Sequence, residues 1–253
     1  MDRKLLKLPF RGKSIPEWTC PTCSKGILRI KEDSFRKEEI SRSCKAREHD
    51  AWEPEWIEYI YTCILACSND KCGEVVASSG TGSVDWDVVE EFDGNYEQVH
   101  TDLFFPKYFV PHLHLFNLPD DCPPRVSSLL HESFRIFFSS PKAAANSVRA
   151  AIEELLTELK IKRFSTARGK RRRMVPLHDR INLLPAKYDQ VKEMIFAIKW
   201  LGNAGSHGHT EVSMDDVMDA YELTEYILEF IFEPKAQSLA AIAKKVNKKK
   251  GPA

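Results

Sequence analysis

The spacing of apolar residues changes near Arg125 and divides the chain into two parts. After this point apolar residues recur every three or four positions, which is typical of amphipathic helices. The pattern predicts four helices, over residues 125–140, 140–161, 187–202 and 213–233. Most of the links are short, although a basic loop and a short helical turn separate the second helix from the third. These segments favour a helical bundle.

Two of these helices carry start signals. Ser140 is expected to cap the second helix, and Pro141 suits the first turn, where a backbone N–H has no partner within the helix. The fourth helix is expected to begin at Ser213, with Asp216 three residues later completing a variant of the capping box.

The first half of the chain has shorter apolar runs. Residues 26–30, 56–66 and 74–78 are predicted as strands. Residues 103–124 are rich in proline and aromatic residues, so they cannot form a helix and are expected to form an extended connector. We therefore expect domains at residues 1–102, 103–124, 125–235 and 236–253, the last being a basic tail.

Two cysteine pairs lie in this first half, Cys20-x2-Cys23 and Cys67-x4-Cys72. Each pair is expected to form a tight turn, and Gly73 after the second pair permits a positive φ angle. Four thiolates so placed would close a tetrahedral structural zinc site, which predicts a zinc-ribbon-like β domain over residues 1–102. The alternative is a set of free structural thiols.

The remaining cysteines of this region are interpreted differently. Cys63 lies in a strand-like run and is expected to be a small buried apolar residue. Cys44 lies in a polar insertion and receives no role. Because no histidine falls within the two pairs, the site is expected to be structural rather than catalytic.

Composition sets the class of protein. The chain of 253 residues is 43% hydrophobic and 29% charged, which is typical of a soluble globular protein. No apolar run reaches the roughly 18–20 residues of a membrane span, and the charged N-terminus lacks a signal-peptide core. We therefore expect a cytoplasmic, prokaryotic protein with no membrane contact.

The net charge is zero, yet charge is unevenly distributed. Residues 84–102 hold seven carboxylates and no Lys or Arg, whereas residues 162–173 hold seven basic residues and no acid. A basic segment of this kind can bind RNA or DNA, the alternative being a solvated loop. The candidate nucleic-acid ligands are Arg168, Lys170, Arg171, Arg172 and Arg173.

The sequence "IKWLGNAGSHGH" at residues 198–209 follows a helical pattern and is rich in glycine. Together with the cysteine pairs, the proline-rich connector and "AAANSVRAAIEELL", it resembles the domain of unknown function 4145, found in bacterial restriction and phage-defence proteins. That family is similar to the HEPN superfamily of helical domains, many of which are metal-independent ribonucleases or inactive relatives.

The resemblance implies an α+β protein in which a zinc-ribbon-like β domain precedes a HEPN-like helical bundle that forms a homodimer. The HEPN ribonuclease motif has an arginine, a polar residue and, four to six residues after the arginine, a histidine. On this chain the polar residue maps to Asn203 and the histidine to His207, but Gly202 stands where the arginine would be. Arg149, one turn from Glu153 on a helix face, could replace it or could form an ion pair.

Three interpretations of residues 202–208 follow. Gly202 could be a left-handed helix cap, with His207 a buried structural histidine. The stretch could be a ribonuclease site in which His207, Asn203 and Arg149 act on RNA. It could also belong to a nucleic-acid-binding or partner-binding module of a defence or restriction system, without strong catalysis of its own. The spacing matches neither a P-loop nor a dinucleotide fingerprint.

Overall fold

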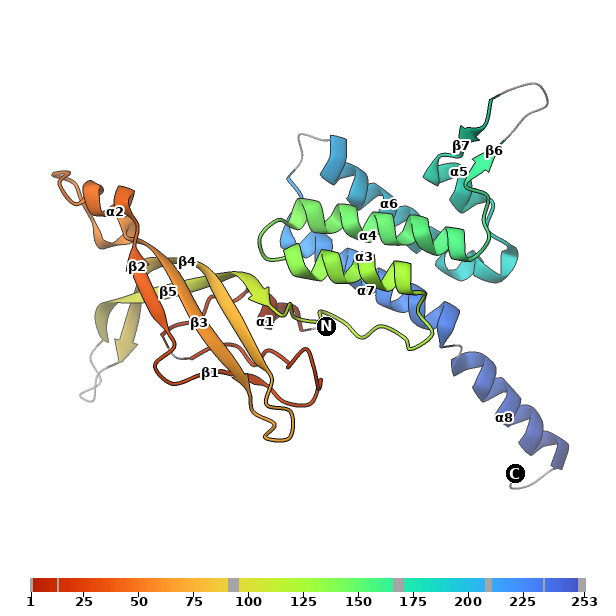
Figure 1. The fold of residues 1–253 in the computed structure, drawn as a ribbon, viewed down its shortest axis with the longest axis horizontal. Coiled ribbons are helices and arrows are strands. Elements are labelled where there is room, and N and C mark those ends of the chain that lie inside the picture. Colours follow the sequence, from red (N-terminus) through yellow and green to blue (C-terminus); the bar gives the residue numbers. More distant parts are fainter. Residues whose placement is uncertain are drawn as a thin grey trace. The chain divides into compact units, whose positions relative to one another are not determined.

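The computed structural model describes residues 2–12, 14–90, 96–165, 171–207, 211–233 and 235–249; at Glu90, 205–207 and 235–241 the description covers the backbone alone. The chain forms two compact units (Figure 1). The N-terminal unit contains Asp2–His114 and Phe134–Ser140, and the helical unit contains Leu115–Ser133 and the chain from Pro141 onward. This architecture confirms a mixed α+β protein.

The N-terminal unit is built on one curled antiparallel sheet (Figure 1). The first two strands pair with different parts of the third, which pairs with the fourth, and the fourth pairs with the fifth. The strands are β1 (Leu28–Ile30), β2 (Arg36–Glu39), β3 (Glu58–Cys67), β4 (Val75–Glu90) and β5 (Tyr96–Val110). Three short helical segments accompany them, α1 (Arg3–Lys7), α2 (Ser41–Ala46) and the 3-10 turn η1 (Pro54–Trp56).

Strand β3 alternates between the core and the solvent, as its sequence leads one to expect. Tyr61, Cys63 and Leu65 are buried, whereas Ile60 and Ile64 are exposed. The prediction that Cys63 is a buried apolar residue is therefore confirmed, and burial raises the pKa of its thiol to about 11.

A cluster of aromatic side chains lies in this core. The rings of Phe10 and Tyr61 meet edge to face with centroids 5.1 Å apart, and Phe104 lies 5.4 Å from Phe10. The buried Tyr61 hydroxyl bonds the Ser78 hydroxyl at 3.0 Å, so the polar end of this ring is satisfied inside the core.

The expected connector over residues 103–124 is wrong at its start, because Leu103–Val110 belongs to β5 and pairs with β4. Proline lacks the N–H that a sheet ladder uses, and Pro106 lies where the register shifts between Ser79 and Gly80. The backbone also comes very close at this point, since a Cβ at residue 80 would lie 2.1 Å from the Phe105 carbonyl oxygen. A bulge thus lets a proline-containing segment remain in the sheet.

Beyond Ser83, β4 and β5 leave the third strand and continue as a two-stranded arm, Val84–Glu90 with Tyr96–Asp102. The arm coincides with most of the acidic segment of the sequence. Trp86, Val88, Val89 and Tyr96 are exposed on it.

The helical unit is a bundle of α3, α4, α6 and α7, with α5 packed against α6. Its elements are α3 (Pro124–Ile136), α4 (Pro141–Glu158), β6 (Phe164–Ser165), β7 (Arg173–Met174), α5 (Leu177–Asn182), the 3-10 turn η2 (Ala186–Tyr188), α6 (Asp189–His207), α7 (Met214–Phe232) and α8 (Lys235–Lys249). None of the described helices is both long and apolar enough to cross a membrane.

A buried hydrogen-bond chain joins three helices of the bundle. The Ser133 hydroxyl on α3 lies 2.9 Å from the Ala144 carbonyl of α4 and 2.7 Å from the Tyr221 hydroxyl of α7. Burial raises the pKa of Tyr221, so its hydroxyl keeps its proton. These polar groups are paired inside the core and fix the relative register of the three helices.

The expected starts of two helices are confirmed. Helix α4 begins at Pro141, and α7 begins after Ser213 with a complete capping box. The Ser213 hydroxyl accepts the Asp216 N–H at 3.2 Å, and the Asp216 carboxylate accepts the Ser213 N–H at 2.8 Å.

The expected end of the third bundle helix at Gly202 is wrong. Helix α6 continues through Gly202 and Asn203 to His207, so Gly202 is not a left-handed cap. Among the described residues, positive φ angles at glycine occur only at Gly12 and Gly73. The basic tail also differs from expectation, since most of it forms α8.

Candidate functional site

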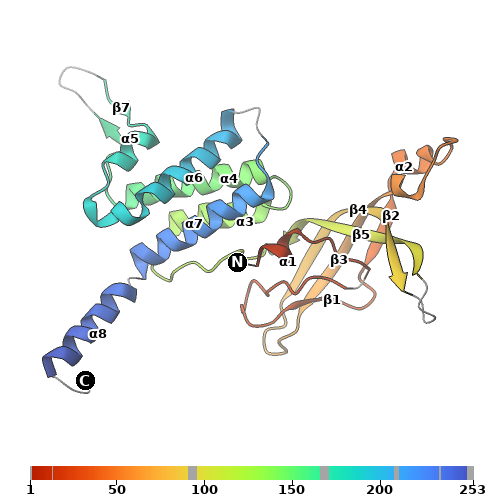
Figure 2. The same cartoon turned by 180° about the vertical axis from the view of Figure 1, so that it is seen from behind.

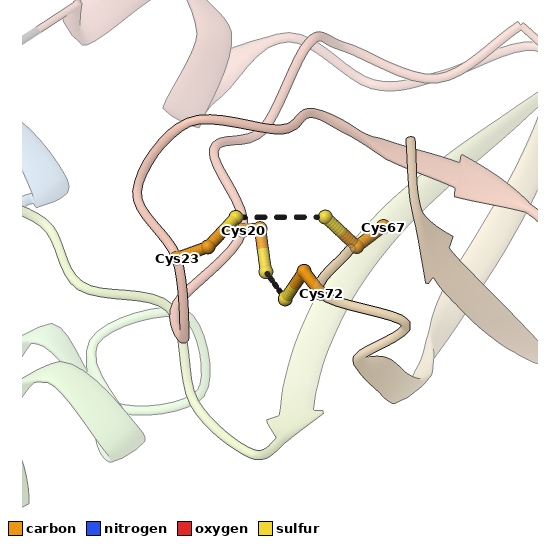
Figure 3. A group of neighbouring side chains, drawn as sticks. All are labelled: Cys20, Cys23, Cys67 and Cys72. Carbon is orange, nitrogen blue, oxygen red and sulfur yellow. Dashed lines mark hydrogen bonds between the residues drawn. The ribbon is translucent and has the colours of Figure 1, made fainter. Parts of the chain in front are cut away.

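Four cysteines from the two predicted pairs lie together at one end of the sheet (Figure 3). Their sulfur atoms all lie within 4.8 Å of one another. The Sγ–Sγ distance is 3.9 Å between Cys20 and Cys72 and 3.7 Å between Cys23 and Cys67. These distances are far longer than the roughly 2.05 Å of a disulfide bond, so the four thiols are free.

The cluster has the dimensions of a tetrahedral metal site. A zinc ion about 2.3 Å from each of four sulfurs holds neighbouring sulfurs about 3.8 Å apart. The two measured pairs lie within 0.1 Å of that value. The four cysteines could therefore bind a metal ion.

Backbone amides point toward the cluster, as in a metal-binding knuckle. The Gly26 N–H donates to Cys23 Sγ at 3.4 Å, and the Asn69 N–H donates to Cys67 Sγ at 3.4 Å. The Asn69 side-chain amide also reaches Cys23 Sγ, at 3.7 Å. Such donors stabilise the thiolate form, which is the form that binds metal.

Two glycines make these turns possible. Gly73 has φ +64°, which confirms the positive φ expected after the second pair. At Gly26 a Cβ atom would lie 2.4 Å from Cys67 Sγ, so any side chain there would displace a cluster sulfur. The contribution of Gly26 and Asn69 was missed in the sequence, although both lie within three residues of a cysteine of the cluster.

The thiols divide into acidic and weakly acidic members. Hydrogen bonds from the Gly26 and Lys25 amides lower the pKa of Cys23 to about 6. The Asn69 amide acts in the same direction on Cys67, but burial and the neighbouring thiols outweigh it and raise the pKa of Cys67 to about 12. A bound cation would favour the thiolate form of these cysteines, because its positive charge offsets the repulsion between the thiolates.

A second group of predicted residues lies where α4 and α6 cross. Gly202 is buried, and a Cβ at this position would lie 2.5 Å from Cβ, 2.8 Å from Cδ and 3.0 Å from Cγ of Arg149. The Arg149 guanidinium forms the i,i+4 ion pair with Glu153 at 2.8 Å. The structure therefore places the side chain of Arg149 directly against the backbone of Gly202.

The other predicted site residues, Asn203 and His207, lie on the last turns of α6. Asn203 is half-buried and lies one turn before His207, so their backbone positions share a helix face. The side chain of His207 lies outside the described part of the structure. Lys199 is buried, with its ammonium 3.3 Å from the centre of the Trp200 ring.

The basic segment forms a small hairpin, which we call the basic hairpin (residues 162–174). Phe164 pairs with Met174 and Ser165 with Arg173. Its described basic residues are all exposed, namely Lys162, Arg163, Arg171, Arg172 and Arg173. The predicted ligands Arg168 and Lys170 lie outside the described residues.

An exposed aromatic ring lies among these arginines. The Arg172 guanidinium lies 3.7 Å from the centre of the Phe164 ring, and that of Arg163 lies 5.9 Å away. Within the described hairpin, no arginine forms an ion pair with a carboxylate. The hairpin thus presents positive charge together with a flat apolar surface.

A buried arginine anchors the base of the hairpin and was missed in the sequence. Arg180 on α5 donates to the Glu153 carbonyl at 2.9 Å, to the Thr157 hydroxyl at 2.9 Å and to the Ile161 carbonyl at 3.4 Å. Burial lowers the pKa of its guanidinium. These bonds tie α5 to the end of α4, from which the hairpin leaves.

Comparisons with known proteins give two matches, one to each half of the chain. Residues 131–249 match the family model of the domain of unknown function DUF4145. This result confirms the resemblance predicted from the sequence and extends it through α8. Residues 8–109 match a second model, the domain of unknown function DUF8608. Searches of curated proteins and of solved structures each gave no match.

Proposed function

We propose that this chain binds single-stranded nucleic acid, RNA or DNA, through the basic hairpin of a HEPN-like helical domain, without strong catalysis of its own. In this proposal the protein acts in a prokaryotic defence or restriction system, where it also contacts a protein partner. The DUF4145 match supports the family context, which the resemblance links to restriction and phage defence.

The observation that carries the proposal is Arg172 stacked on the exposed Phe164. Proteins that bind single strands combine cations for the phosphates with aromatic rings on which bases stack. The basic hairpin supplies both, and its exposed arginines keep their charge for a ligand. The Arg180 bonds to Thr157 and Ile161 tie α5 to the end of α4 at the base of the hairpin.

Zinc is proposed as the ion of the cysteine cluster, in a structural role. Four thiolate ligands fill a tetrahedral shell and suit zinc, and no position stays open for a substrate or water. A bound ion would join the Cys20–Cys23 turn to the Cys67–Cys72 turn and hold the end of β3.

A salt titration tests nucleic-acid binding. Fluorescence anisotropy of a labelled RNA or DNA strand of about 20 nucleotides should report binding that weakens with salt, by about 0.7 in the log–log slope per phosphate contact. Replacing Arg171, Arg172 and Arg173 with glutamine should reduce that slope by about 2.

The matched control removes three charges from other positions of the helical unit, with Lys142, Lys187 and Lys192 changed to glutamine. It should bind like the wild type. A Phe164→Ala variant, which keeps the charge, should weaken single-strand binding on the order of tenfold through lost stacking. Equal effects of the two triple variants, or no binding at low salt, would reject the proposal.

A second candidate, a metal-independent HEPN-type ribonuclease, is favoured by the contact of Arg149 with Gly202. In that reaction His207 would move a proton of the attacking 2′-hydroxyl, and Arg149 would stabilise charge on the phosphate. Incubation with total RNA separates the candidates. Cleavage that His207→Ala abolishes and Arg149→Gln lowers by about 10²–10³-fold supports the ribonuclease, whereas equal RNA profiles reject it.

The proposed role in a defence system is tested by a separate experiment. The wild type and the triple arginine variant would be expressed from the native operon, and phage plating efficiency compared. A protective effect that the triple variant loses and the lysine control retains supports the proposal. Equal plating with and without the wild-type gene for every phage tested contradicts it.

A further inference from the structure

An apolar groove runs between α6 and α7 on the helical unit. It has a volume of about 520 Å³ and is lined by Met194 and Trp200 from α6 and by Leu223 and Tyr226 from α7. Trp200 is 59% exposed and Tyr226 is 39% exposed. Large apolar side chains exposed together in a groove typically mark an interaction site.

Carboxylates border this groove. Asp219 and Glu222 of α7 lie in its lining and are exposed. Two copies of the groove placed face to face would bring these carboxylates together, which is unfavourable. The groove is therefore suited to an occupant that is apolar on one side and positively charged beside it.

Helix α8 has this character, and its described residues make at most marginal contact with the bundle helices. Ile242 and Val246 lie one turn apart, 56% and 37% exposed, and the helix contains lysines but no acidic residue. Figures 1 and 2 show α8 leaving the end of α7 away from the other helices. A helix of 15 residues is barely stable in water without a packing surface.

The short link between α7 and α8 disfavours docking within one chain. Only Glu233 and Pro234 separate the two helices. A sharp reversal after a helix commonly uses a left-handed residue, usually glycine, whereas Glu233 has φ −120°. The residue before a proline also prefers an extended conformation, which leads the chain away from the helix it has left.

We propose that α8 of a second copy of this chain occupies the groove between α6 and α7, so that two copies exchange these helices. Ile242 and Val246 contact Trp200 and Tyr226, and the α8 lysines face Asp219 and Glu222 of the partner. Each copy gives one helix and receives one, so the assembly closes as a symmetric dimer. A homodimer is already implied by the family resemblance, so the new element is the exchange of α8 into this groove. The exchange goes beyond the proposed function, because neither nucleic acid nor metal takes part.

The first test is the mass of the purified full chain without nucleic acid, by light scattering after size exclusion. We expect twice the 29.0 kDa mass of the chain. Ile242→Asp combined with Val246→Asp should weaken the dimer at least about tenfold, and Trp200→Glu should do the same. Trp86→Asp, an equally exposed position on the arm, is the matched control and should leave the dimer intact.

Mixing the two defective variants distinguishes exchange from docking within one chain. The Trp200→Glu copy keeps a working α8, and the Ile242→Asp/Val246→Asp copy keeps a working groove. Exchange predicts that native mass spectrometry of the mixture shows a heterodimer, although each variant alone is monomeric.

Docking within one chain predicts monomers in every sample, which would overturn the proposal. A wild-type dimer that survives all of these changes would also overturn it. So would a monomeric wild type whose α8 variants lose only nucleic-acid binding.

Discussion

Arg149 of α4 lies against the backbone of Gly202 of α6, so closely that a methyl group at residue 202 would come within 2.5 Å of the Arg149 Cβ. Real Cβ atoms do not approach other atoms this closely, so the crossing of the two helices requires glycine. Packing against Arg149 thus explains why residue 202 is a glycine.

Gly202→Ala is expected to destabilise the helical unit. Overpacking costs about 1–3 kcal/mol, and the better helix propensity of alanine offsets about 1 kcal/mol of it, so the free energy of unfolding should fall by up to about 2 kcal/mol. Urea denaturation measures the change. Arg149→Ala retains the Cβ and should not rescue the variant, whereas Arg149→Gly should. A more stable Gly202→Ala protein would contradict the crossing geometry.

Metal binding is expected to require the four clustered cysteines. The purified wild type should contain about one zinc per chain, and Cys67→Ser should contain much less and melt at lower temperature, because metal binding is coupled to folding. Elemental analysis and thermal denaturation give the two readouts. Cys44→Ser, which changes an exposed cysteine outside the cluster, should match the wild type. Equal zinc in both variants would exclude the site.

The capping box of α7 should give a pH-dependent contribution to stability. Hydrogen bonds from the Ser213 hydroxyl and amide lower the pKa of Asp216 below its ordinary value of 3.8. Because the folded pKa is depressed, the stabilisation is present above pH 3.8 and is lost as pH falls through the folded pKa.

Asp216→Ala should therefore cost about 0.5–1 kcal/mol at pH 7 and less at pH 3, as measured by denaturant titration. Asp215→Ala is the control, because it lies in the same first turn but outside the capping box. A cost of Asp216→Ala that does not change with pH would show that its charge plays no part.

Arg180 is expected to stabilise both the bundle and the base of the basic hairpin. Arg180→Leu leaves the Glu153 and Ile161 carbonyls without this donor and should cost about 1–3 kcal/mol. Amide exchange in β6 and β7 should also become faster, since the hairpin loses its anchor. The exposed Arg163→Leu is the control and should change stability little. Unchanged exchange in the hairpin would mean that Arg180 does not hold it.

The sequence was sufficient where a local rule decides the structure. The spacing Cys20-x2-Cys23 and Cys67-x4-Cys72 predicted the cluster because each pair forms a local turn. Two such pairs in one domain are typical of a structural metal site. Ser213 with Asp216 predicted the start of α7 for the same reason, since a capping box involves only neighbouring residues. The α+β class and all four bundle helices also followed from periodicity.

The sequence predictions failed where the structure depends on a contact between residues that are far apart in the chain. Gly202 ends a helix by local preference, but its contact with Arg149 fifty-three positions earlier in the chain supplies another reason for glycine. Pro106 led to the prediction that this segment lies outside the sheet, but the bulge beside Gly80 allows the proline to remain in β5. The positions of Arg180 and Phe164 likewise depend on contacts that no spacing rule encodes.

The acidic arm has a consequence for how copies of this protein avoid each other. Where β4 and β5 extend past the sheet, both of them are edge strands, and exposed edges with apolar side chains such as Trp86 and Val88 tend to join other chains. Asp85 and Glu97 place exposed negative charge along the same ribbon, whereas Asp87 is paired with Arg11. At neutral pH these like charges disfavour the pairing of two arms, which is how charged edge strands oppose aggregation.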